Sequence, residues 1–166
     1  LDTLSELKKS NTKTLLIGVT FALLDFIEKQ KIDFSNLIVM ETGGMKGRRK
    51  EMVREELHNI LCAGFGVSQI HSEYGMTELL SQAYSNGEGI FNTPPWMKIL
   101  TREISDPLAL CKENKTGGIN VIDLANISSC CFISTQDLGR TLGNNQFEII
   151  GRFDNSDTRG CNLMIS

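Results

Sequence analysis

Short apolar runs alternate with amphipathic helical patterns through the first half of the sequence, and this alternation restricts the fold more than any other feature. Residues 15–17 and 37–40 are apolar runs of strand length, typical of strands buried in a parallel sheet. Residues 21–32 separate them and residues 48–63 follow them, and both segments have apolar residues at helical spacing. Residues 67–70 predict one more strand. Alternating strands and helices predict an α/β fold with a layered sheet.

After position 96 the pattern changes to short apolar runs divided by glycine, asparagine and aspartate. Residues 119–124, 130–134 and 147–150 are strand candidates, and Gly117-Gly118 and residues 143–145 predict turns between them. We therefore expect two portions. These are an α/β portion over residues 1–96 and a small antiparallel β-rich portion, with the C-terminal segment, over residues 97–166.

Charge and cysteine content argue against several classes of protein. A net charge of −3 over 166 residues gives no electrostatic basis for binding nucleic acid or an anionic membrane. No apolar run approaches the length of a membrane span. The five cysteines are odd in number and have no C-x-x-C spacing. A disulfide framework or a structural zinc site is therefore not expected, and a reducing cytoplasm is the expected location.

Two short clusters carry most of the chemical information. Residues 73–78 (EYGMTE) follow the pair Gly43-Gly44 and combine an aromatic ring, a glycine, a hydroxyl and a carboxylate. These groups can stack on a purine, let backbone approach closely, bond a phosphate and hold Mg²⁺. The second cluster contains Asp137 and is followed by Arg152. A carboxylate can accept from ribose hydroxyls and an arginine can bond the sugar or phosphate, so the clusters predict half of a nucleotide site.

The order of these motifs resembles that of adenylate-forming enzymes, which include acyl-CoA synthetases, firefly luciferase and peptide-synthetase adenylation domains. More narrowly, the chain is similar to the acyl-protein synthetase (LuxE-type) family, and residues 160–164 contribute to the likeness. The resemblance implies that ATP, with Mg²⁺, activates a carboxylic acid, expected to be a fatty acid, to an acyl-adenylate. A thiol then takes the acyl group. The implied partner is a reductase or acyltransferase subunit that accepts it.

The resemblance also implies how the nucleotide base and sugar would be held. Tyr74 would lie against the adenine, with the Gly43-Gly44 backbone on the other side. Gly75 would permit close backbone approach. Asp137 would accept from the ribose hydroxyls, and Arg152 would contact the ribose region.

The same comparison implies three residues for the chemistry. Thr77 would bond the α-phosphate, and Glu78 would help to bind Mg²⁺. Cys161 would accept the acyl group as a thioester, which requires the thiolate.

Three departures from the pattern qualify the comparison. Residues 135–137 read Thr-Gln-Asp where these enzymes have Thr-Gly-Asp, and the lysine that commonly follows the arginine motif is absent. No glycine-rich phosphate loop precedes Met40. We therefore expect the chain to be the C-terminal part of a larger enzyme, with the upstream half absent, and to adenylate poorly alone.

Other interpretations stay open at this point. The chain could be a fragment of an aryl- or phenylacetate-type acyl-CoA ligase, or a non-catalytic module that binds a nucleotide or acyl-adenylate. Single residues also have structural explanations. Tyr74 could be a half-buried aromatic, Glu78 a carboxylate at a helix N-terminus, and Cys161 a small buried hydrophobe.

Overall fold

The computed structural model describes residues 2–10, 12–30, 34, 36–43 and 52–153. Among these residues three helices lie in the first half: α1 (Asp2–Lys9), α2 (Thr20–Lys29) and α3 (Arg54–Phe65). The strands are β1 (Thr14–Gly18), β2 (Leu37–Glu41), β3 (His71–Tyr74), β4 (Ala83–Ser85), β5 (Ile90–Asn92), β6 (Met97–Arg102), β7 (Gly117–Asp123), β8 (Phe132–Gly143) and β9 (Gln146–Arg152). A short 3₁₀ helix, η1 (Leu124–Asn126), follows β7. Within the described residues the strands form one nine-stranded sheet in the order β1-β2-β3-β4-β5-β9-β8-β7-β6.

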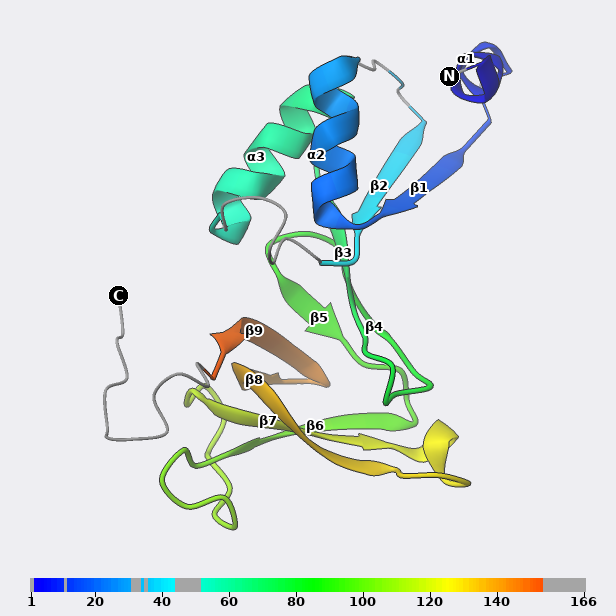
Figure 1. The fold of residues 1–166 in the computed structure, drawn as a ribbon. Helices are drawn as coiled ribbons and strands as arrows, with labels where there is room; N and C mark the ends of the chain where they lie inside the picture. Colours follow the sequence, from blue (N-terminus) through cyan, green and yellow to red (C-terminus); the bar gives the residue numbers. More distant parts are fainter. Residues whose placement is uncertain (1, 11, 31–33, 35, 44–51, 154–166) are drawn as a thin grey trace.

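Strands β1, β2 and β3 are parallel and lie side by side in chain order. Helix α2 connects β1 to β2, and α3 connects β2 to β3, so both right-handed crossovers move in the same direction along the sheet. They therefore place α2 and α3 on the same face of the sheet, as Figure 1 shows. The apolar sides of both helices pack there against β2. The buried members of this cluster are Leu23, Leu24, Phe34, Leu37, Val39, Leu57, Leu61, Phe65 and Ile70. The predicted α/β fold with a layered sheet is confirmed.

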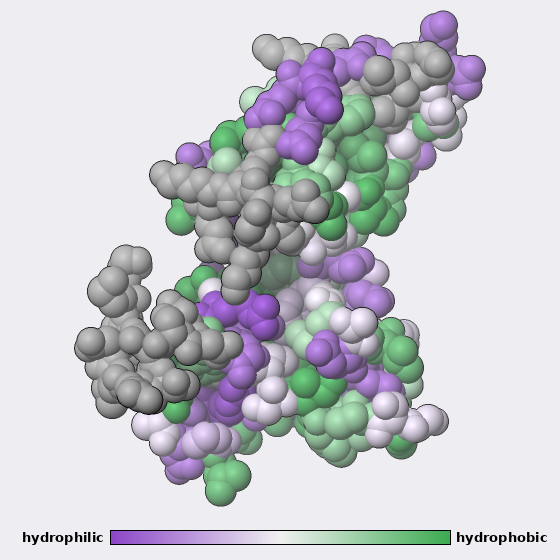
Figure 2. All heavy atoms as spheres, in the orientation of Figure 1, coloured by the Kyte–Doolittle hydropathy of each residue, from purple (hydrophilic) through white to green (hydrophobic). Residues whose placement is uncertain are grey.

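The prediction that residues 15–17 form a buried strand is half wrong. They do form β1, but Leu15 and Ile17 are 52% and 53% exposed. Alternation along the strand directs Leu16 to the helices and its two neighbours to the opposite face. Figure 2 shows hydrophobic surface where Figure 1 draws β1 and β2.

Helix α3 differs from the predicted helix over residues 48–63. Residues 48–51 lie outside the described part of the chain, and the helix begins at Arg54 and ends at Phe65. The stop is Gly66, whose left-handed φ of 68° ends the helix two residues beyond the last one of the predicted segment and beyond its neighbour Gly64. Gly64 lies inside the helix, where an added Cβ would stand 2.7 Å from Ile27 of α2. This glycine therefore allows the two helices to approach closely.

Two further predictions around the strands need correction. The strand predicted over residues 67–70 is displaced, because the strand is β3 (His71–Tyr74) and Ile70 instead buries its side chain in the helical core. Gly117-Gly118 is not a turn, since these residues begin β7. A Cβ at Gly117 would meet the carbonyl oxygen of Arg102 on the paired strand. The glycines thus permit close strand contact.

From β4 onward the pairing is antiparallel. Asn144 and Asn145 have φ angles of 50° and 60°, as in a type I′ turn, and confirm the turn predicted between the last two strands. A second apolar cluster lies in this region and contains Tyr74, Leu79, Ala83, Phe91, Met97, Ile99, Ile119, Val121 and Phe147. No helix within the described residues has the length and apolar character needed to cross a bilayer.

Candidate functional site

Six of the predicted site residues line one cavity at the carboxyl ends of β2 and β3, the edge at which sheets of this kind place ligands. This cavity of about 710 Å³ lies between these strand ends and residues of β8 and β9. The predicted residues that line it are Gly43, Tyr74, Gly75, Glu78, Asp137 and Arg152. Thr77 is exposed and does not line it. Gly44 and Cys161 lie outside the residues that the structure describes.

Asp137 is the centre of the polar side of this cavity. The hydroxyl of Tyr74 donates to Asp137 Oδ2 at 2.8 Å, and Arg152 Nε lies 3.2 Å from Oδ1. Asp137 and Arg152 are direct cross-strand partners of β8 and β9, and such pairs bring side chains on one face together. The backbone amide of Asp137 donates to Thr135 Oγ1 at 3.1 Å, which fixes the local backbone. The carboxylate is therefore held from two sides in one orientation.

Tyr74 is buried, with 8% of its surface exposed. Its ring meets Phe147 and Phe91 edge to face, at centroid distances of 5.3 and 6.0 Å. Burial, and then the charge of Asp137, raise the pKa of the Tyr74 hydroxyl well above its usual range. The hydroxyl therefore stays protonated and acts as a donor to Asp137. Stacking of adenine on this ring stays a prediction, and it would use only the small part of the ring that faces the cavity.

Glu41, at the end of β2, also lines the cavity and was not among the predicted site residues. Its Oε2 accepts from the Gly43 amide at 2.7 Å and from Thr20 Oγ1 at 3.1 Å. His58 Nε2 lies 3.8 Å from Oε1. Burial acts to raise the pKa of Glu41, but hydrogen bonds from His58, Ser72, Gly43 and Thr20 outweigh it, and the pKa falls to about 2. The buried carboxylate is therefore ionised at neutral pH.

Arg54 is a second lining residue that the sequence analysis missed. It begins α3, and its guanidinium lies 5.6 Å from the centroid of the Phe91 ring. Arg54 Nη2 also donates to the carbonyl of Ile149 at 3.3 Å. A Cβ at Gly89 would collide with this guanidinium, so the glycine leaves room for it. Arg54 thus connects the helical half of the molecule to β5 and β9.

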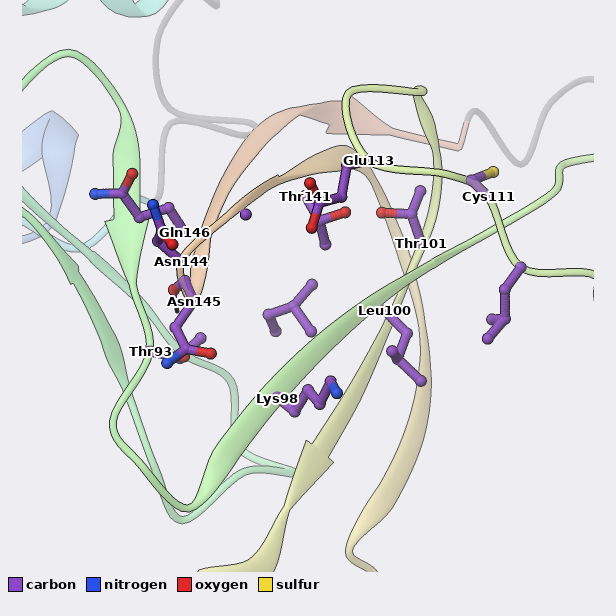
Figure 3. Close-up of a pocket in the computed structure, with 13 residues that line it drawn as sticks. Thr93, Lys98, Leu100, Thr101, Cys111, Glu113, Thr141, Asn144, Asn145 and Gln146 are labelled. Carbon is purple, nitrogen blue, oxygen red and sulfur yellow. Dashed lines mark hydrogen bonds between the residues drawn. The ribbon is translucent and has the colours of Figure 1, made fainter.

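A separate cavity of about 320 Å³ lies between β6 and the turn that joins β8 to β9 (Figure 3). Lys98 extends from β6, and Asn144 and Asn145 come from the turn. None of the predicted site residues that the structure describes lines this second cavity. The nucleotide motifs therefore converge on the cavity around Asp137.

Known proteins were compared with the chain at the level of sequence and of fold. A model of the acyl-protein synthetase family LuxE matches residues 1–166, the whole sequence. A search of curated proteins found no match.

Solved structures with the same fold are adenylate-forming enzymes. ATP-bound MatB from Rhodopseudomonas palustris matches with a TM-score of 0.62 and 16% identity, over 91% of this chain and 33% of that one. O-succinylbenzoate coenzyme A synthetase (MenE) from Bacillus subtilis, with ATP and magnesium, matches with a TM-score of 0.61 and 20% identity, over 91% and 34%.

The luciferase-like enzyme of the mealworm Zophobas morio matches with a TM-score of 0.59 and 16% identity, over 92% of this chain and 40% of that one. The chain thus spans a third to two fifths of the length of these structures. At these identities the likeness concerns the fold. The family match covers every residue, and the chain belongs to the LuxE family of acyl-protein synthetases.

Proposed function

We propose that this chain forms part of a site that activates a fatty acid with ATP and passes the acyl group to a thiol, first to Cys161. Family membership supports acyl activation by ATP in general. The observation that carries the more specific proposal is the arrangement around Asp137. Its carboxylate is held by Tyr74 and Arg152 in a cavity that Gly43 and Glu78 also line.

Asp137 is suited to bind the ribose. An ionised carboxylate has about four acceptor positions, and within the described residues Tyr74 and Arg152 use one on each oxygen. The remaining positions can accept from the two ribose hydroxyls. The side chain of Arg152 is 70% exposed and only its Nε contacts Asp137 among the described residues. Within the described residues no ion pair engages the rest of its planar guanidinium, which is suited to donate to sugar or phosphate oxygens.

Glu78 is suited to help bind Mg²⁺. Within the described residues no group of three or more His, Cys, Asp or Glu side chains could hold a metal ion. Mg²⁺ commonly takes one or two carboxylates and completes its shell with substrate phosphates and water, so Glu78, one of the carboxylates that line the cavity, could bind this ion without a cluster of protein ligands. Bound Mg²⁺ would screen the charge of the phosphates. The family resemblance assigns the Thr77 hydroxyl, one residue earlier, to the α-phosphate; Thr77 is exposed beside the cavity rather than in its lining.

The reaction needs positioning more than acid–base catalysis. A carboxylate oxygen attacks the α-phosphorus of ATP, the bond to the β-phosphate oxygen breaks, and pyrophosphate leaves with the electron pair. The carboxylate is a poor nucleophile and is repelled by the phosphates, so alignment and electrostatic stabilisation supply most of the rate. A thiolate then attacks the acyl carbonyl, and AMP leaves. The family resemblance is the support for Cys161 as this thiolate, and Cys161 lies outside the described residues.

The test is calorimetric titration with a non-reactive acyl-adenylate mimic, carrying either a long alkyl or an aryl group, with and without Mg²⁺. We expect tighter binding of the alkyl mimic. Asp137→Asn is expected to weaken binding at least about tenfold, since a hydrogen bond to a charged group contributes about 1.5–3 kcal/mol. Glu78→Ala should remove the effect of Mg²⁺. Asp106→Asn is the matched control, because Asp106 is exposed and, among the described residues, its carboxylate accepts only from the Leu108 amide.

Two results would contradict the proposal. Binding that is unchanged in Asp137→Asn would place the ligand elsewhere. Tighter binding of the aryl mimic would favour the aryl-acid ligase instead.

A further inference from the structure

We propose that Glu41 is a positioning residue for the nucleotide. Its carboxylate fixes residues 42–43, which follow β2, form one edge of the cavity and are called the Gly43 turn below. The inference rests on the proposed function, since it assigns a role within the same site. Glu41 does not take part in bond making or breaking.

The Gly43 turn is held by a closed set of hydrogen bonds. Glu41 Oε2 accepts from the Gly43 amide at 2.7 Å and from Thr20 Oγ1 at 3.1 Å. The Thr20 amide in turn donates to the Gly43 carbonyl at 2.8 Å. One carboxylate oxygen therefore connects the first residue of α2 to the turn after β2. Both backbone groups of Gly43 are engaged in this way.

The backbone of Gly43 can adopt many conformations, so its hydrogen bonds select the one observed. Its φ of 76° lies in the left-handed region, and no atom stands within 4 Å of the position of an added Cβ. The glycine is therefore required by backbone conformation and not by lack of space. Just before it, the Thr42 amide donates to the Gly18 carbonyl at 3.1 Å and continues the pairing of β1 with β2. Between these fixed points, the carboxylate of Glu41 sets where the Gly43 backbone lies.

The position of this turn matters because Gly43 and Asp137 line the same cavity. A base lying between the Gly43 backbone and Tyr74 would have its place set by Glu41, while Asp137 sets the place of the ribose. Glu41 is itself only 8% exposed, and His58 Nε2 lies 3.8 Å from its other carboxylate oxygen, Oε1. A buried charge with this many partners holds its neighbours firmly.

Three variants separate positioning from general stability. Glu41→Gln keeps the shape but loses the charge, and Thr20→Val loses the hydroxyl donor, whereas Thr20→Ser keeps it. The matched control is Asp123→Asn, because Asp123 is also a buried carboxylate, accepts from the amides of Leu80 and Ser81 and does not line the cavity. Each variant is measured by calorimetric titration with Mg²⁺-ATP, by thermal unfolding and by hydrogen exchange of the Gly43 amide.

We expect Glu41→Gln to raise the Kd for ATP at least about tenfold, equivalent to about 1.4 kcal/mol, and to speed exchange of the Gly43 amide. Thr20→Val should do the same more weakly, and Thr20→Ser should resemble wild type. When acid-dependent exchange of pyrophosphate into ATP is measured, Glu41→Gln should raise the KM for ATP more than it lowers kcat. Asp123→Asn should lower the unfolding temperature and leave the Kd unchanged.

The inference is overturned if wild type binds ATP and Glu41→Gln binds it equally well. It is also overturned if Asp123→Asn, at the same loss of unfolding temperature, loses as much affinity. A wild-type protein that binds no ATP would instead refute the proposed function, and the inference with it.

Discussion

Replacing Tyr74 with phenylalanine separates two roles of this residue. The substitution keeps the ring and its contacts with Phe91 and Phe147 but removes the hydroxyl that donates to Asp137 at 2.8 Å. If Tyr74 acts by stacking on the adenine, Tyr74→Phe will leave nucleotide affinity unchanged. If it acts by holding Asp137, affinity will fall. The geometry of the site favours the second result.

The expected magnitude follows from the burial of the hydrogen bond. A hydrogen bond to a charged group contributes about 1.5–3 kcal/mol, and Tyr74 and Asp137 are both buried, so solvent does not replace the lost donor well. Arg152 still pairs with the other carboxylate oxygen, which favours the lower half of that range. We expect the free energy of unfolding to fall by about 2 kcal/mol, which for a chain of this size lowers the unfolding temperature by roughly 4–8 °C.

The assay combines urea unfolding with calorimetric titration of Mg²⁺-ATP on wild type, Tyr74→Phe and Tyr74→Leu. Tyr74→Phe is expected to weaken ATP binding about three- to tenfold, and Tyr74→Leu to weaken it further because the ring is lost as well. An unchanged Kd in Tyr74→Phe, together with a large loss in Tyr74→Leu, would refute the assignment of the hydroxyl to Asp137 and support stacking alone.

Three other predictions concern acid stability, acyl transfer and helix packing. The pKa of Glu41 in the folded protein is about 2, below its ordinary value of 4.5. By linkage, the ionised Glu41 stabilises the folded protein by about 3 kcal/mol above pH 4.5, and this contribution is lost as the pH falls towards 2. Urea unfolding should show the advantage of wild type over Glu41→Gln shrinking through this window, and a constant difference would contradict it. Cys161→Ser should form the acyl-adenylate but no thioester, so hydroxylamine-labile label on the serine variant would contradict the acceptor role. Gly64→Ala should lower unfolding free energy by about 1–3 kcal/mol by overpacking against Ile27, and an unchanged denaturation midpoint would refute this packing argument.

The alternation of helix and strand in the first half was predictable, most clearly at β2, where local pattern and burial agree. Residues 37–40 are apolar and lie within β2, at the centre of the parallel strands. The strand after α3 was misplaced because its polar residues give no apolar signal, whereas the apolar Ile70 before it packs with the helices. The three-residue strands β4 and β5 were missed because pairing with distant neighbours, rather than local sequence, stabilises them.

The sequence motifs identified some of the residues that line the cavity but none of the contacts between them. The motifs identified Tyr74, Asp137 and Arg152. These residues meet only because of the register of β8 with β9 and the position of β3, neither of which the motifs reveal. Glu41 could have been found, because alternation along β2 places it on the same buried face as Leu37 and Val39.

Arg54 could not have been found from local sequence. An arginine at the start of an amphipathic helix has the pattern of a solvent-facing residue. Only the long-range contact with Ile149, and the room left by Gly89, bring it to the cavity.

The most direct test of adenylation is acid-dependent exchange of pyrophosphate into ATP, measured with the full polypeptide that contains this sequence and a panel of fatty and aryl acids. We expect exchange that requires the acid, is fastest with a long-chain fatty acid, and falls in both Glu78→Ala and Asp137→Asn but not in Asp106→Asn. The contradicting result is a wild-type protein that binds the acyl-adenylate mimic but exchanges pyrophosphate no faster than Glu78→Ala with any acid. It would argue against catalysis and favour a binding module.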